Sequence, residues 1–180
     1  MGKKRPTLSE SIVKASVIHT ISYFIMGFLA YTLFDYEHLY AETSLKLLMR
    51  PASEPVVMAG PLFQPIRGAL FGIVFFLLRE SLFRKKSGWL IMWIVLVVLG
   101  IIGTFGPTPG SFEGMIYTVL PLQIHLIGLP EIVIQALILS LGVFYWVNHP
   151  GKKWLNWTFG IVFFLMLLLP LLGLFVEQPS

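Results

Sequence analysis

Long apolar stretches separated by short charged connections are the feature that most constrains this chain. Crossing the hydrocarbon core of a membrane, about 30 Å thick, takes roughly 20 helical residues. The apolar stretches approach that length without the period-two alternation of strands, so each predicts a membrane-spanning helix. The expected fold class is all-α, an integral membrane bundle of five transmembrane helices in one domain, 1–180. The spans are expected at about 12–34, 62–83, 88–105, 128–147 and 154–176.

The basic residues are distributed so unevenly that they predict an orientation. Ten of the 13 Lys and Arg residues lie before or at the start of the first expected span, at or after the end of the second, or after the fourth. The remaining ones are Lys46, Arg50 and Arg67. Because basic residues near helix ends stay in the cytoplasm, the N-terminus should be cytoplasmic and the C-terminus outside.

Composition agrees with a membrane protein. The chain is 56% apolar and only 12% charged, with a mean hydropathy of +0.81, which leaves too little polar surface for a water-soluble globule. A basic pI near 9.4 could suggest nucleic acid, but no basic stripe is interleaved with aromatic residues, so we expect no nucleic-acid partner. The expected partner is the lipid bilayer, and the expected location is a cell membrane, namely the plasma membrane of a bacterium.

Several kinds of site are disfavoured by composition and spacing. The chain has no cysteine, which excludes disulfides and thiolate chemistry. Its histidines, His19, His38, His125 and His149, are too scattered in expected depth for a metal or haem site. We therefore expect no metal and no cofactor. The first apolar stretch resembles a signal peptide, but it lacks a good cleavage pattern and is expected to remain as a helix.

The two long outer connections differ in character. Residues 35–61 place apolar side chains among acidic ones, which fits either a short helix on the outer leaflet or an irregular loop. Residues 104–126 contain the run from Gly106 to Ser111, whose prolines and glycines predict non-helical backbone. Such backbone at membrane depth needs protein or water around it, so this segment is expected to cover the outer mouth of the bundle.

Arg67 is the most informative single residue. It falls in the first turns of the second span, at the outer end, where the helix dipole disfavours a cation. The charge bias of the loops disfavours it there as well. Burial near the bilayer adds a cost of about 1–3 kcal/mol unless the group pairs or reaches the interface. Residues that break several local rules at once are often functional.

Glu131 is the natural partner of Arg67, because it begins the fourth span on the same side. Gln135 follows one turn later on the same helix face. Three interpretations remain open: a structural ion pair, an arginine that reaches the membrane interface, and a ligand-binding or catalytic site. In the last case Arg67 would bind an anion, and Glu131 and Gln135 would orient it.

Further polar residues are expected on the same outer side, namely Gln64, Glu113, Ser111 and His125. A guanidinium with amide and hydroxyl donors nearby suits a phosphate or carboxylate head group. A nucleophile–base pair of Ser111 and His125 would require geometry that the sequence does not give. Other catalytic signatures are missing, so whether the chain is an enzyme stays undecided.

Two helix faces are suited to packing. Gln64, Gly68 and Gly72 lie four residues apart and form a ridge of small residues that predicts close helix contact, within the chain or between protomers. In the first span, His19, Tyr23 and Tyr31 follow one stripe. We expect that stripe to face the bundle, where it could form interhelical hydrogen bonds, bind a ligand or relay protons.

These patterns predict a small polytopic membrane protein that binds or acts on an amphiphilic or anionic ligand, such as a lipid. The ligand would occupy a pocket on the outer side, between the second and fourth spans. One alternative is a structural or interaction subunit, a homo-oligomer or a component of a membrane complex, whose polar groups only lock helices together. Another is a small transporter that works as an oligomer, with His19 and Glu131 along its path.

Overall fold

The computed structural model describes residues 5–34, 46, 48–51 and 54–176, and this part of the chain is all-helical. The long helices are α1 (Leu8–Phe34), α4 (Gly60–Leu77), α6 (Gly88–Val97), α9 (Leu129–Asn148) and α10 (Lys153–Val176). The short elements are α3 (Pro55–Met58), α5 (Arg79–Phe83), the π-helical turn η2 (Val98–Ile102), α7 (Phe112–Tyr117) and α8 (Leu122–Ile127).

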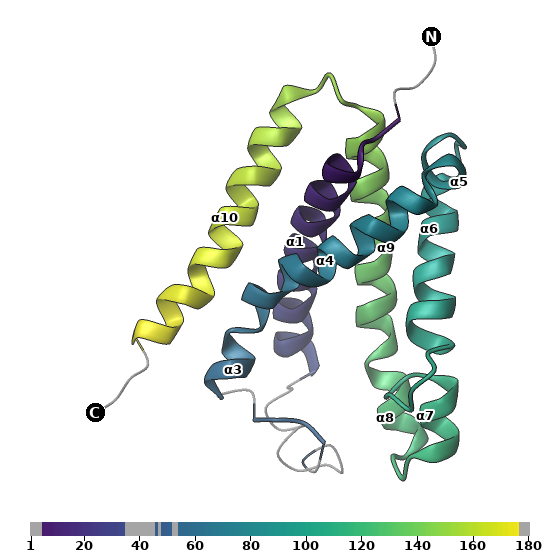
Figure 1. The fold of residues 1–180 in the computed structure, drawn as a ribbon. Helices are drawn as coiled ribbons and strands as arrows, with labels where there is room; N and C mark the ends of the chain where they lie inside the picture. The colour runs from purple at the N-terminus through teal and green to yellow at the C-terminus, as the bar shows by residue number, and fades with distance from the viewer. Residues whose placement is uncertain (1–4, 35–45, 47, 52–53, 177–180) are drawn as a thin grey trace.

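The helices alternate in direction between two ends of a bundle (Figure 1). Helix α1 lies at the centre and packs against α4, α9 and α10, while α6 packs against α9. Helix α4 crosses α1 obliquely, whereas α6 with η2 runs beside α9 (Figure 1). The start of α1, the turn between α5 and α6, and the turn between α9 and α10 all lie at one end, drawn at the top (Figure 1).

A capping box fixes the start of α1. The Thr7 hydroxyl accepts from the Glu10 amide at 3.2 Å, and the Glu10 carboxylate accepts from the Thr7 amide at 2.9 Å. This reciprocal pair satisfies two amides that a helix start would otherwise leave without partners. The apolar run that follows can therefore begin as helix immediately after the basic N-terminal residues.

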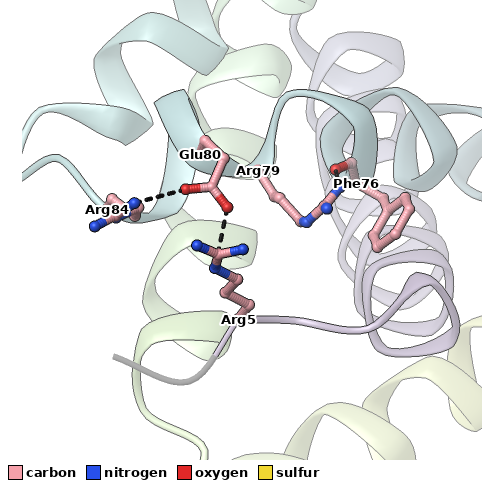
Figure 2. A network of polar contacts seen from close by, with 5 residues as sticks. All are labelled: Arg5, Phe76, Arg79, Glu80 and Arg84. Atoms are coloured by element: carbon pink, nitrogen blue, oxygen red, sulfur yellow. Dashed lines mark hydrogen bonds and ion pairs between the residues drawn. The ribbon is translucent and has the colours of Figure 1, made fainter. Parts of the chain in front are cut away.

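Basic residues from separate parts of the sequence meet at the end that contains the start of α1, which we call the basic end. Arg5 contacts Glu80 at 3.1 Å, and Arg84 contacts the same carboxylate at 2.9 Å (Figure 2). Lys14 donates to the Trp146 carbonyl at 3.4 Å, near the C-terminal end of α9. A cation there complements the helix dipole. The contacts join the N-terminal segment to α5 and α1 to α9.

Within the described residues, four helices are long and apolar enough to cross a membrane: Leu8–Leu33, Gly60–Leu77, Leu122–Asn148 and Lys153–Leu174. The third expected span is shorter than predicted, since regular helix covers only Gly88–Ile102 rather than 88–105. At 1.5 Å per residue that segment is roughly 20 Å long, which is less than the hydrocarbon core. Its last turn widens into the π-helix η2, and Gly103 then ends it.

The second expected span also ends earlier than predicted, because α4 stops at Leu77 and not at residue 83. Arg79 explains the break. Its guanidinium donates to the Phe76 carbonyl at 2.9 Å and stacks on the Phe76 ring at 4.2 Å (Figure 2). The side chain thereby satisfies one carbonyl that the helix end leaves open. The chain continues as the separate short helix α5.

The ridge of small residues on α4 forms a contact within the chain. A Cβ atom added to Gly68 would lie 2.5 Å from Ser16 Cα, and one added to Gly72 would lie 2.5 Å from Ile12 Cα. The backbones of α1 and α4 therefore approach too closely for any side chain at these positions. The Ser16 hydroxyl donates to the Pro65 carbonyl at 2.9 Å and adds a polar link to the same interface.

Helix α10 lies at the periphery of the bundle (Figure 1). None of the residues in its most apolar window is buried. Large apolar side chains such as Trp157, Ile161 and Phe164 are 57% or more exposed. A helix that is apolar all round and uncovered by protein is what a lipid environment allows.

Of the two long connections, 104–126 lies within the described residues, whereas 35–61 lies partly outside them. For 35–61 we expected either a short helix or an irregular loop, and its described residues include the short helix α3. In 104–126 the Gly106–Ser111 run is non-helical, as predicted, and it is followed by α7 and α8. Gly110 has a φ of +83°, a conformation that glycine adopts without strain. Helices α7 and α8 lie at the end opposite to the basic end (Figure 1).

Replacing Gly72 by alanine should destabilise the bundle, because the new methyl group would meet the α1 backbone at 2.5 Å. Overpacking of this kind costs about 1–3 kcal/mol. Thermal unfolding in detergent measures the effect. The matched control is Gly27→Ala in α1, where an added Cβ has nothing within 4 Å. The internal α1–α4 contact would be contradicted by equal melting temperatures of the two variants.

Glu80 should titrate below its ordinary value. A hydrogen bond from Arg84 lowers the pKa of this exposed carboxyl below 4.5, and the charge of Arg5 lowers the pKa further. The folded state is therefore favoured by this group above about pH 4.5, and that contribution is lost as the pH falls through the lowered pKa. Carboxyl-carbon NMR should show Arg84→Gln raising the Glu80 pKa, whereas Lys153→Gln should leave it unchanged.

Candidate functional site

A cavity of about 410 Å³ lies between α1, α4, α6 with η2, and α9. Its walls include the last turns of α6 with η2 and the first half of α9, which belong to the half of the bundle away from the basic end (Figure 1). The polar lining residues are His19, Tyr23, Arg67, Thr108, Glu131 and Gln135. The apolar ones are Leu70, Phe71, Leu96, Gly100, Ile101, Pro109, Ile132, Ala136 and Leu139.

Arg67 brings a permanent positive charge to this cavity. Because α4 begins at Gly60, the residue lies two turns inside the helix, deeper than its expected place near the start. Arg67 is exposed and lines the cavity, and its guanidinium carbon lies 5.7 Å from the centroid of the Phe71 ring. A cation over an aromatic face is attracted to it by about 0.5–2 kcal/mol. The Phe71 ring thus lies beside the guanidinium of a residue that lines the cavity.

Glu131 and Gln135 reach the cavity from α9. Glu131 lies in the first turn of that helix, where its charge complements the dipole, and Gln135 follows one turn later. Both are half-buried. Tyr23 of α1 is within electrostatic reach of both the Glu131 carboxylate and the Arg67 guanidinium. The cavity therefore brings together Arg67, Glu131 and Gln135, the central residues of the predicted site.

His19 forms a buried part of the cavity wall, with 2% of its surface exposed. Its Nε2 lies 3.1 Å from Gln64 Oε1, while the Gln64 amide nitrogen donates to the Gly60 carbonyl at 3.2 Å. The Gln64 oxygen must therefore accept, so Nε2 of His19 donates and Nδ1 is left as an acceptor. Within the described part of the chain, His19 Nδ1 has no hydrogen-bond partner.

Gln64, another residue of the predicted site, is buried and is not among the residues that line the cavity. Its side-chain amide orients the His19 ring, because the amide oxygen accepts from His19 Nε2 and the amide nitrogen donates to the Gly60 carbonyl. The hydrogen bond between His19 and Gln64 is an interhelical contact of the kind expected for the polar stripe of the first span. Tyr31, on the same stripe, lies farther along α1 and is 45% exposed.

Ser111, His125 and Glu113 do not line the cavity. The Ser111 hydroxyl donates to the Thr108 carbonyl at 2.7 Å and accepts from the Gly114 amide at 2.9 Å as the N-cap of α7. His125 Nδ1 accepts from the Gly110 amide at 3.2 Å. Ser111 and His125 are thus each occupied in shaping the loop, which does not support a nucleophile–base pair.

The loop that these residues shape does contribute to the site. Thr108 and Pro109 line the cavity. His125 is 1% exposed, and its Nε2 lies 3.3 Å from the Thr118 hydroxyl. The ring therefore ties Gly110, next to the cavity, to the segment between α7 and α8. The predicted ligand residues His125 and Ser111 act on the cavity by holding its rim.

His19, Tyr23 and Thr108 are the polar cavity residues that the sequence did not assign to the predicted site. His19 and Tyr23 belong to the polar stripe of the first span. Their stripe was expected to face the bundle, but nothing in the spacing placed it beside Arg67 and Glu131. The missing signal is the crossing of α1 and α4, which depends on Gly68 and Gly72. Among the described residues, no three His, Asp or Glu side chains gather in a way that could hold a metal ion.

Comparison with protein-family models, with curated proteins and with solved structures found no match to this chain. Function must therefore be inferred from the residues of the site, since a helical bundle by itself is compatible with many activities. What the cavity offers chemically is a guanidinium, a carboxylate, an amide and an imidazole above apolar walls.

Proposed function

We propose that this protein crosses a cell membrane five times and binds the anionic head group of an amphiphile in the cavity beside Arg67. The observation that carries the proposal is the composition of the cavity wall. Charged and polar side chains of Arg67, Glu131 and Gln135 share one cavity with apolar residues such as Phe71 and Leu139. A concave, mostly apolar site with a few convergent polar groups is the usual form of a small-molecule site.

The cost of placing charge at this depth supports a binding role. An ionised side chain inside a membrane protein is expensive unless it faces a cavity or a partner. Arg67 faces the cavity, where the electrostatic attraction for an anion is stronger than in bulk water. A guanidinium also matches phosphate or carboxylate oxygens with two parallel hydrogen bonds. Glu131 and Gln135 would then accept from, or donate to, hydroxyl or ammonium groups of the same head.

The five-pass topology is supported by the arrangement of the described helices. The contacts of Arg5 and Arg84 with Glu80, and of Lys14 with Trp146, bring basic residues of distant parts of the chain to one end. We place this basic end in the cytoplasm. Since α6 with η2 runs between the two ends beside α9 (Figure 1), it would be the third crossing despite its short length.

Binding of an anionic amphiphile should depend on Arg67. Removing a charge-assisted hydrogen bond costs about 1.5–3 kcal/mol, which corresponds to a loss of roughly ten- to a hundredfold in affinity. We expect Arg67→Gln to weaken binding of dodecyl phosphate by that factor, and to leave binding of dodecyl maltoside unchanged. Native mass spectrometry of the protein in nanodiscs measures both.

Arg79→Gln is the matched control, because Arg79 also stacks on a phenylalanine ring but lies at the basic end. It should bind dodecyl phosphate like the wild type. If Arg67→Gln lowers the melting temperature yet binds as tightly as the wild type, the polar residues only hold helices together. The chain would then be a structural or interaction subunit. Proton- or ion-dependent uptake of the probe into vesicles would instead indicate a transporter.

Cysteine labelling tests the number of crossings, since the native chain has no cysteine. Ser87 precedes α6 and Val119 lies between α7 and α8; both are exposed. We expect a membrane-impermeant maleimide to label Val119→Cys from outside intact cells, and Ser87→Cys only after the membrane is opened. Labelling of both from one side would show that α6 with η2 does not cross.

A further inference from the structure

We infer that the groove between α4 and η2 holds the hydrocarbon chain of a single-chain amphiphile, which enters the cavity sideways from the bilayer. This inference rests on the proposed binding of the head group at Arg67. It assigns the apolar part of the same ligand to Leu70 of α4, Leu96 of α6, and Gly100 and Ile101 of η2, all of which line the cavity.

The lining of the cavity changes from polar to apolar along two helices. In α4, Arg67 is followed one turn later by Leu70 and Phe71, and in α9, Glu131 and Gln135 are followed by Leu139. Both helices run toward the basic end (Figure 1). A ligand whose head lies at Arg67 would therefore meet apolar side chains within one turn of that residue.

The cavity is partly open, and residues that line it from α4 and η2 are exposed. Leu70 lines the cavity and is 60% exposed, and Gly100 of η2 lines it and is exposed as well. The neighbouring side chains Ile66 and Leu99 are 66% and 65% exposed. An opening bordered by exposed apolar side chains is suited to a hydrocarbon chain and unsuited to a hydrated ion.

The local structure of η2 makes room for the chain. Gly100 lies in a π-helical turn, and a Cβ atom added to it would have nothing within 4 Å. A π-turn inside an α-helical segment is rare and is frequently found at functional sites. Here the wider turn and the missing side chain coincide at the wall of the cavity. The volume of about 410 Å³ is near the lower end of the range for ligand sites, about 300–1,000 Å³, which favours one chain over two.

Filling this space should weaken binding of the hydrocarbon chain without affecting binding of the head group. We expect Gly100→Leu to weaken binding of dodecyl phosphate by roughly tenfold or more, since even one methylene in an apolar pocket changes affinity by about 10–200-fold. Binding of butyl phosphate, which has the same head and a short chain, should change little. Leu70→Trp, which fills the groove from the α4 side, should act in the same way.

Gly160→Leu is the matched control, because Gly160 of α10 also has nothing within 4 Å of an added Cβ and lies away from the cavity. It should bind both probes like the wild type. Melting temperatures close to that of the wild type would exclude misfolding as the cause. If Gly100→Leu and Leu70→Trp bind dodecyl phosphate normally while Arg67→Gln does not, the head-group site stands and the chain groove is overturned. If wild type and all variants bind neither phosphate, the proposed function fails as well.

Discussion

The constraint on which the structure depends is the placement of one permanent cation, Arg67, two turns inside an apolar helix. A guanidinium cannot be deprotonated in a protein, so its surroundings must provide what water would otherwise provide. In this bundle they do so with the face of Phe71, a shared cavity with Glu131, and the nearby polar groups of α1. The cavity and its polar lining are therefore consequences of that charge as much as of helix packing.

The position of Arg67 depends on an uncharged contact, that of Gly68 and Gly72 with the α1 backbone. Gly68 and Gly72 let the α1 backbone approach α4 closely, which favours the observed register of the two helices. This register puts His19 against Gln64 and Phe71, and it aligns the polar stripe of α1 with the cavity. Close packing through small residues is a common way to join helices where lipid removes the hydrophobic drive between them. In this chain the same packing also builds a site.

The regular parts of the fold could be predicted from the sequence because helix length and apolar content are local properties. Glu131 and Arg67 were expected at similar depth in the membrane. Their presence in the lining of one cavity could therefore be predicted. The break after Leu77 could not be predicted, because it depends on Arg79 capping the helix through its own side chain. The π-turn at Gly100 likewise leaves no periodic signal.

The loop 104–126 is a second region whose contribution to the site could not be predicted from the sequence. Its prolines and glycines predicted irregular backbone, but not which side chains would turn toward the cavity. Ser111 and His125 are drawn into hydrogen bonds with Thr108, Gly110 and Gly114, so the loop presents Thr108 and Pro109 instead. A side chain whose type suits ligand binding can instead form hydrogen bonds with the backbone of its own turn. Only three-dimensional contacts decide between these uses.

The most direct test is an experimental structure of the protein in a lipid nanodisc with dodecyl phosphate. We expect phosphate density within hydrogen-bonding distance of the Arg67 guanidinium, and chain density between Leu70 and Gly100. Density for the probe only at the basic end, with Arg67 directed into bulk water, would contradict it.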